Sequence, residues 1–148
     1  MEIGETFVRD DPENGCFGCS PHNPRGLQLR FTRTGEDTIT CRFTAASDLA
    51  GAPGVLHGGI QATVLDEALG MAARTRFGGE EEPSLVTADF QLHYRRPVPL
   101  GEPLVIRGEL VRADDRDFHV EGRIESEAGE ALTLAEARWR RIDGPSRG

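Results

Sequence analysis

The spacing of apolar residues changes twice along the chain, from alternation to a helical period and back to alternation. From residue 27 to residue 44, and again after residue 85, apolar and polar residues alternate over short segments separated by turn residues, which is typical of antiparallel strands. Between about Gly58 and Phe77 the apolar residues recur at helical spacing and cover most of the circumference. This pattern predicts one buried helix between two groups of strands.

Two strands are expected before the helix and four after it. The first pair runs through residues 27–31 and 38–44 around a glycine-containing turn. The later strands are expected around Val86, Ala88, Phe90, Leu92 and Tyr94; around Leu104, Ile106 and Leu110; around Phe118, Val120 and Ile124; and over residues 131–141. Because strands and helices do not alternate along the chain, this order predicts an α+β domain with one antiparallel β-sheet wrapped around one long central helix.

The segments around this core are expected to be irregular. Residues 1–26 are rich in Gly, Pro, Asn and Asp and predict an irregular N-terminal lead-in, followed by one domain over residues 27–142 and a C-terminal tail at 143–148. Gly78 and Gly79 are a stop signal for the helix, and residues 80–83 should form a solvated loop.

Composition and charge restrict the classes of function. The 148 residues are 37% hydrophobic and 28% charged, which is typical of one globular domain. The formal net charge of −8 would repel a polyanion, so nucleic-acid binding is not expected. No apolar run approaches the roughly 20 residues that a membrane span needs, and the acidic N-terminus lacks the order of a signal peptide. We therefore expect a cytoplasmic protein without nucleic-acid or membrane partners.

Two adjacent acids, Asp66 and Glu67, interrupt the apolar helix. One interpretation places Asp66 on a solvent stripe or in a satisfied structural network. The other is a working carboxylate, kept dry so that its basicity rises. The two acids lie about 100° apart around a helix. Small neighbours at Ala62 and Gly70 should leave open space along the face of Asp66, which favours Asp66 as the acid beside a cleft.

The helix start carries the sequence His57-Gly58-Gly59. It can be an ordinary turn into a helix, or it can present unpaired N–H groups that hold a carbonyl oxygen as that oxygen gains negative charge. Gly58 and Asp66 are eight residues apart, which is roughly 12 Å along a helix. One carbonyl cannot touch both, so a shared reaction would require a homodimer with sites across its interface.

These residues resemble the hotdog-fold thioesterases of the PaaI-like group. The similarity lies in His57-Gly58-Gly59, in an Asp eight residues after the first Gly, and in a strand that ends Tyr-x-x-Pro and is followed by Gly-Glu, here Tyr94, Pro97, Gly101 and Glu102. The opening CFGCSPHNPRGLQLRF is similar to the lead-in of a subset of this family, and the resemblance spans roughly residues 15–142. It implies a hotdog fold, assembly as a homodimer or homotetramer, and hydrolysis of an acyl-CoA thioester.

The resemblance also implies site roles. Asp66 would be the nucleophile or the base that activates water, and the Gly58 N–H would polarise the thioester carbonyl. His57 would help to position that carbonyl, Gly59 would contact substrate, and Thr87 would supply a hydroxyl near the water or leaving group. Some relatives carry an Asn before His-Gly-Gly that is absent from DLAGAPGV, and Thr87 stands where others have Ser.

Two further signals have competing interpretations. Arg95 and Arg96 could contact the phosphates of CoA, or they could be a solvated strand end paired with acids. Cys16 and Cys19, followed by His22, have the spacing of metal ligands, but a structural zinc site needs four ligands. The third cysteine, Cys41, belongs to a core-facing strand position. We therefore expect no metal and no cofactor, with the cysteine segment packing as a turn.

Two alternatives to a thioesterase remain open at the level of sequence. One is a hotdog-fold enoyl-CoA hydratase or dehydratase, in which a His paired with a helix acid would transfer protons. The other is a non-catalytic protein that binds acyl-CoA. The identity of the acyl group, and the choice between nucleophile and general base for Asp66, are also open.

Overall fold

The computed structural model describes residues 1–78 and 83–143. The described elements, in chain order, are β1 (Thr6–Phe7), β2 (Phe31–Arg33), β3 (Thr38–Thr44), the 3-10 turn η1 (Ser47–Leu49), α1 (Gly58–Arg74), β4 (Leu85–Tyr94), β5 (Pro103–Ala113), β6 (Asp117–Ser126) and β7 (Ala131–Arg141).

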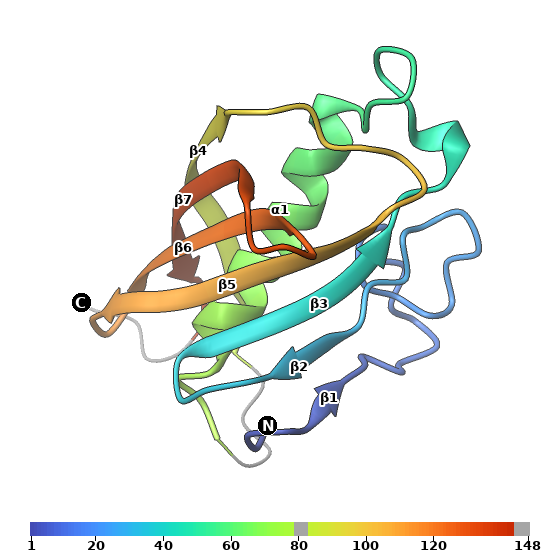
Figure 1. Cartoon of the computed structure of the whole chain (residues 1–148). Helices are drawn as coiled ribbons and strands as arrows, with labels where there is room; N and C mark the ends of the chain where they lie inside the picture. The colour runs from blue at the N-terminus through green and yellow to red at the C-terminus, as the bar shows by residue number, and fades with distance from the viewer. Residues whose placement is uncertain (79–82, 144–148) are drawn as a thin grey trace.

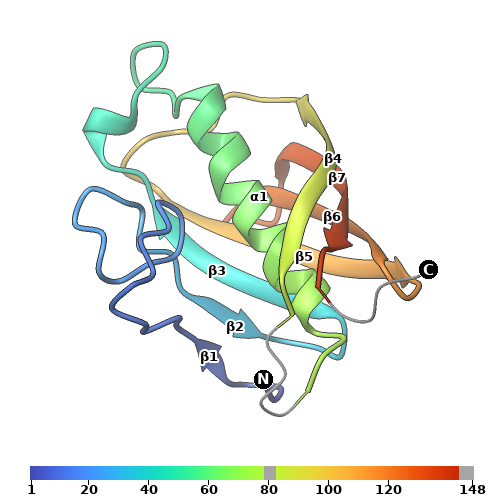
Figure 2. The same cartoon turned by 180° about the vertical axis from the view of Figure 1, so that it is seen from behind.

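All seven strands form one antiparallel sheet in the order β1-β2-β3-β5-β6-β7-β4. The sheet curves around α1, which lies against one of its faces (Figures 1 and 2). The strands β1 and β4 are the two edges. This arrangement confirms the predicted α+β fold with one antiparallel sheet around a central helix. No helix in the described part of the chain is both long and apolar enough to cross a bilayer.

The helix lies close to the sheet because small residues face it. Gly108, Gly122 and Ala135 are opposite one another on β5, β6 and β7. A Cβ at Gly108 would lie 2.6 Å from the carbonyl oxygen of Ala68, and one at Gly122 would lie 2.8 Å from Leu69 Cδ2. This close approach buries nearly all of the apolar side of α1, including Val64, Leu65, Ala68, Leu69 and Ala72.

A β-bulge in β4 changes which side chains face the helix. The register with β7 pairs Thr87 with Trp139 and then Asp89 with Arg138, so Ala88 is an extra residue in the ladder. Simple alternation would put Thr87 on the same face as Asp89. Because of the bulge, Thr87 shares the helix-facing side with its neighbour Trp139, while Asp89 faces away with Arg138.

The lead-in and the first predicted strand differ from expectation. The lead-in contributes β1, which pairs with β2 and extends the sheet. The strand predicted from residue 27 begins only at Phe31, because Gln28 has a φ of 51° and the preceding backbone turns to pair with the lead-in. The N–H groups of Leu27 and Leu29 donate to the carbonyl oxygens of Phe17 and Gly18, at 2.7 and 2.9 Å.

Three other expectations concern boundaries. The helix ends at Arg74, three residues before the predicted end. Pro83, expected in a solvated loop, is buried, while the rest of that loop, with Gly79, lies outside the described residues. The predicted tail at 143–148 also lies outside them except for Asp143.

Candidate active site

Asp66 lies in the middle of α1 and is half-buried. The hydroxyl of Thr87 on β4 donates a hydrogen bond to Asp66 Oδ1 at 2.7 Å. Burial raises the pKa of the Asp66 carboxyl above its ordinary value; the Thr87 hydrogen bond lowers it, and the charge of Glu67 raises it further. Among the described residues no donor is bonded to Asp66 Oδ2, so one carboxylate oxygen is held and the other is available for chemistry.

The indole of Trp139 packs against the helix at Gly70, where the sequence predicted open space. A Cβ at Gly70, four residues after Asp66, would lie 2.6 Å from Trp139 Cη2. The small residue at position 70 therefore accommodates an aromatic ring, and the gap expected at Gly70 is wrong. Trp139 and Thr87, opposite each other on β7 and β4, together contact the helix around Asp66.

His57 caps the helix start with its own side chain. Its Nδ1 accepts a hydrogen bond from the N–H of Gly59 at 2.9 Å. An imidazole whose Nδ1 is an acceptor carries its proton on Nε2, so the exposed edge of His57 is a hydrogen-bond donor. The cap also occupies the Gly59 N–H, which is therefore not available to a substrate.

Gly58 is the first residue of α1, and its N–H has no acceptor among the described residues. Its carbonyl oxygen accepts a hydrogen bond from the Tyr94 hydroxyl at 2.8 Å. The ring of Tyr94 lies 3.5 Å from where a Cβ at Gly58 would be, so the helix start is fixed against the end of β4. The positive end of the helix dipole and one unpaired donor thus meet at Gly58.

One chain does not bring Gly58 and Asp66 together. Both lie in the same uninterrupted helix, eight residues apart, which separates them by roughly 12 Å along its axis. A carbonyl bound to the Gly58 N–H is therefore out of reach of the Asp66 carboxylate of the same chain. A reaction that used both groups would therefore need a second copy of the chain.

Glu67 faces a different part of the molecule from Asp66. Its Oε1 accepts a hydrogen bond from Cys16 Sγ at 3.2 Å, in the lead-in segment. A Cβ at Gly18 would lie only 2.2 Å from Glu67 Cγ, so the loop between the two cysteines packs directly on this side chain.

The arginines proposed for CoA phosphates have different surroundings. Arg95 and Arg96 are both exposed at the end of β4, and both donate their backbone N–H to the Leu132 carbonyl oxygen at 3.0 Å. Arg96 forms an exposed ion pair with Glu130 at 2.9 Å, as the structural interpretation of this pair predicted. Arg95 has no side-chain partner among the residues that the structure describes.

Two polar residues of the site region had no predicted role. Gln61 is buried on α1, where its Nε2 donates to the Leu56 carbonyl oxygen at 2.9 Å and its Oε1 accepts from the Thr133 hydroxyl at 2.6 Å. These bonds tie the helix start to β7. Tyr94 belonged to the family pattern, but its contact with Gly58 was not expected. A polar residue within an apolar helix pattern was the signal that could have identified Gln61.

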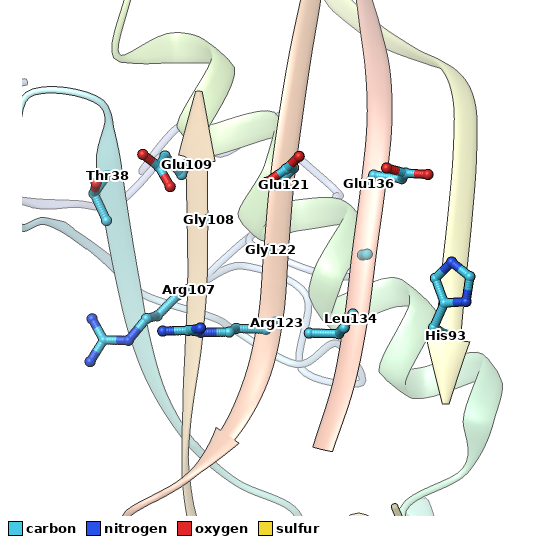
Figure 3. Close-up of a pocket in the computed structure, with 11 residues that line it drawn as sticks. Thr38, His93, Arg107, Gly108, Glu109, Glu121, Gly122, Arg123, Leu134 and Glu136 are labelled. Carbon is cyan, nitrogen blue, oxygen red and sulfur yellow. The ribbon is translucent and has the colours of Figure 1, made fainter. Parts of the chain in front are cut away.

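A hollow of about 400 Å³ lies on the opposite face of the sheet from α1. As Figure 3 shows, Glu109, Glu121 and Glu136 form one row along it, and Arg107 and Arg123 are in the parallel row. It contains none of the predicted site residues. The hollow is therefore separate from the helix-side site.

A single buried helix wrapped by an antiparallel sheet, with its polar side chains at the helix start and centre, defines the hotdog-fold class. The structure superposes on that of a thioesterase superfamily protein with a TM-score of 0.75 and 27% identity, over 85% of this chain and 60% of that one. It matches the PaaI protein of Escherichia coli, from the phenylacetic acid degradation operon, with a TM-score of 0.70 and 16% identity, over 80% and 82% of the two chains. A Bacillus halodurans protein crystallised with CoA gives 0.71 and 21%, over 85% and 82%.

Residues 53–133, more than half of the chain, match the thioesterase superfamily, and the chain belongs to this family. The acyl-coenzyme A thioesterase THEM4 of Rattus norvegicus is 32% identical over 114 residues, which are 76% of this chain and 47% of that protein. The Bos taurus protein of the same name is 33% identical over 96 residues, 65% of this chain and 37% of that one. The chain thus spans about half the length, or less, of these curated relatives.

Proposed function

We propose that this protein hydrolyses an acyl-CoA thioester to a free acid and CoA, with Asp66 as the reacting carboxylate. The observation that carries the proposal is the hydrogen bond from Thr87 to Asp66 on a buried helix of a thioesterase superfamily chain. Two further similarities support the substrate class: the relatives named acyl-coenzyme A thioesterases, and the fold match to a structure that contains CoA.

The carboxylate can act by either of two balanced routes. In the first, Asp66 Oδ2 attacks the thioester carbon, the C–S bond breaks, the CoA thiolate leaves, and water then hydrolyses the mixed anhydride. In the second, Asp66 removes a proton from water as that water attacks, and the proton then passes to the departing thiolate. In both routes Thr87 holds Oδ1, so the free oxygen keeps one orientation.

The Gly58 N–H supplies the second half of the chemistry. The thioester carbonyl oxygen becomes negative as the carbon is attacked, and an unpaired N–H at the positive end of a helix stabilises that charge. The Nε2–H of His57 is a second donor at the same helix start. Because Gly58 and Asp66 of one chain are too far apart, the reacting carbonyl lies between Asp66 of one subunit and Gly58 of another.

The edge strand β4 supports this shared site. β4 is an edge strand of the sheet, and it carries both Thr87 and Tyr94. Val86 and Tyr94 are 42% and 54% exposed, which is high for large apolar residues on a strand. Exposed edges of this kind pair readily with another strand. Pairing of β4 with β4 of a second copy would make a homodimer, which could pair again as a tetramer.

The His57 hydrogen bond argues against the hydratase alternative. A histidine that removes a proton through Nε2 needs its Nδ1–H donated to a partner. Here Nδ1 is the acceptor from the Gly59 N–H, which leaves Nε2 as a donor. His57 is therefore suited to holding a carbonyl oxygen, and Arg95, without a side-chain partner among the described residues, is suited to a CoA phosphate.

The test is hydrolysis of a panel of short-chain, long-chain and aromatic acyl-CoA esters, measured by the appearance of free CoA thiol. The wild-type protein should hydrolyse at least one of these esters. The control variant Glu136→Gln, which lacks an exposed carboxylate on the far face of the sheet, should hydrolyse the same ester at nearly the same rate. Asp66→Asn should lower that turnover by about 10²–10⁴-fold. Binding of acyl-CoA without turnover dependent on Asp66 would overturn the proposal in favour of a binding protein. Single-turnover hydrolysis in ¹⁸O-labelled water separates the two routes, because label in Asp66 itself requires the anhydride.

A further inference from the structure

Cys16, Cys19 and Glu67 meet on the side of α1 that faces the lead-in segment. Their thiol sulfurs and a carboxylate oxygen all lie within 4.8 Å of one another. Cys19 is buried, and Cys16 and Glu67 are half-buried. Two thiols and a carboxylate around one point form a donor set that soft and borderline divalent cations prefer, zinc above all.

The spacing of these atoms suits a tetrahedral ion. Zinc binds thiolate sulfur at about 2.3 Å and carboxylate oxygen at about 2.0–2.2 Å, which places two sulfurs of a tetrahedron about 3.8 Å apart and a sulfur and an oxygen about 3.6 Å apart. Cys16 Sγ and Glu67 Oε1 are already 3.2 Å apart. Movements of about 1 Å or less would therefore bring all three atoms to ligand positions.

The loop that carries the cysteines is held by its own backbone. The N–H of Cys19 donates to Cys16 Sγ at 3.4 Å, and the N–H of Ser20 donates to the Cys16 carbonyl oxygen at 3.1 Å. The carbonyl oxygens of Phe17 and Gly18, between the cysteines, accept from the N–H groups of Leu27 and Leu29. These bonds fix the position of the loop that carries both thiols.

We propose that Cys16, Cys19 and Glu67 bind one zinc ion, with water as the fourth ligand. Binding exchanges the two thiol protons for the cation and converts the hydrogen bond between Cys16 and Glu67 into two metal–ligand bonds. The sequence alone predicted no metal because Cys16, Cys19 and His22 left a structural zinc site without a fourth ligand, Cys41 being expected to face the core. In the structure the His22 Nε2 is paired with Asp10 at 2.6 Å, and the third ligand comes from the helix, 51 residues after Cys16.

The ion would connect the lead-in to the helix at the residue next to Asp66. The lead-in segment runs near α1 (Figure 2), where Cys16 contacts Glu67, and a metal–thiolate link would hold it there more firmly than one thiol hydrogen bond. This site depends on no part of the proposed thioesterase reaction, and its test does not use activity.

The test measures metal directly on the full chain. The wild-type protein, purified under reducing conditions without chelators, should contain one zinc per chain by elemental analysis. After removal of the metal, added Co²⁺ should give the thiolate-to-cobalt charge-transfer absorption and the visible bands of a tetrahedral site. Cys16→Ser, Cys19→Ser and Glu67→Gln should each weaken zinc binding by at least about 100-fold, since changes to groups that only support ligands already cost 10–100-fold.

Cys41→Ser is the matched control. Cys41 is a buried thiol on β3 whose pKa is raised to about 11 by burial, and it lies outside the cluster. This variant should bind zinc like the wild type, and circular dichroism should show that all variants are folded. The proposal is overturned if the folded wild-type protein binds neither zinc nor cobalt, if Cys16 and Cys19 form a disulfide in the purified protein, or if Glu67→Gln leaves zinc affinity unchanged.

Discussion

Asp66 and Glu67 are neighbours on one helix, both half-buried, yet they contact different parts of the molecule. Asp66 accepts a hydrogen bond from a hydroxyl on β4, at the edge of the sheet. Glu67, about 100° further around the helix, accepts from a thiol of the lead-in. The strand leaves one oxygen of Asp66 free, while the lead-in surrounds Glu67 with two sulfurs. The difference teaches that the partner segment, more than burial, sets the chemistry available to a helix carboxylate.

The largest expected effect comes from substituting the two acids, whose roles are distinguished by measuring turnover and zinc content separately. Asp66→Asn should lower kcat by about 10²–10⁴-fold, the usual contribution of a positioned acid–base group, and should leave zinc content unchanged. Glu67→Gln should remove the zinc and have a much smaller effect on kcat. Steady-state kinetics and elemental analysis on the same preparations check both. Equal losses of turnover in the two variants would show that the acids do not have separate roles.

A second substitution tests whether Asp66 works with a glycine of another subunit. Gly58→Pro removes the N–H at the first helical residue, where proline is tolerated, and His57 already has the ψ of 133° that suits a residue before proline. Activity should fall by about 10²–10³-fold. Gly58→Ala keeps the N–H and is the control, since its Cβ would meet the Tyr94 ring at an ordinary 3.5 Å.

Mixing the two inactive variants makes this test specific for a shared site. If Asp66→Asn and Gly58→Pro chains are unfolded and refolded together, a mixed dimer has one site with both defects and one with neither. Random pairing in equal amounts should then restore about one quarter of wild-type activity. A site made within one chain would regain nothing, because every chain carries a defect.

Thr87 should have an intermediate effect, limited to the Asp66 side of the comparison. Thr87→Val keeps the shape but removes the hydroxyl that holds Asp66 Oδ1, and should lower kcat by about 10–100-fold, the equivalent of one hydrogen bond to a charged group. Thr87→Ser retains the hydroxyl and should stay close to the wild type. Equal activity of the Val and Ser variants would contradict a role for the bond. The measurement is kcat on the best substrate of the panel.

The smallest effects concern packing behind each acid. Gly70→Ala would place a Cβ 2.6 Å from the fixed ring of Trp139 and should destabilise the fold by about 1–3 kcal/mol, less a gain of up to about 1 kcal/mol in helix propensity. Gly18→Ala meets the flexible Glu67 side chain and should cost only about 0.5–1.5 kcal/mol. Urea unfolding measures both. Gly15→Ala, which would place its Cβ in open space, is the control and should change stability less than either.

The elements with a regular pattern could be predicted from the sequence. Strand β3 has the predicted bounds, 38–44, because its alternation has one buried face. The buried helix and the order of the long strands also follow from periodicity. The strand expected from Leu27 begins later than periodicity predicts, because the left-handed backbone at Gln28 is a local conformation that apolar spacing does not encode.

The candidate site could be predicted from the sequence only in part. The family resemblance pointed to Thr87, whereas alternation places it with Asp89, and only the bulge turns it toward Asp66. The space beside Gly70 was expected to be open because Trp139 is distant in sequence and its packing cannot be read from spacing. The contact between Cys16 and Glu67 likewise joins segments that no local pattern connects.

The extra residue in β4 makes the partner of Asp66 depend on one backbone irregularity. If β4 kept Ala88 but paired with β7 without the bulge, Ala88 would lie opposite Trp139 and Thr87 would lie opposite Arg140. An alanine would then face Asp66, and the threonine would face away from the helix. The same strand sequence in a regular ladder would therefore leave the carboxylate at the centre of α1 without a hydroxyl partner.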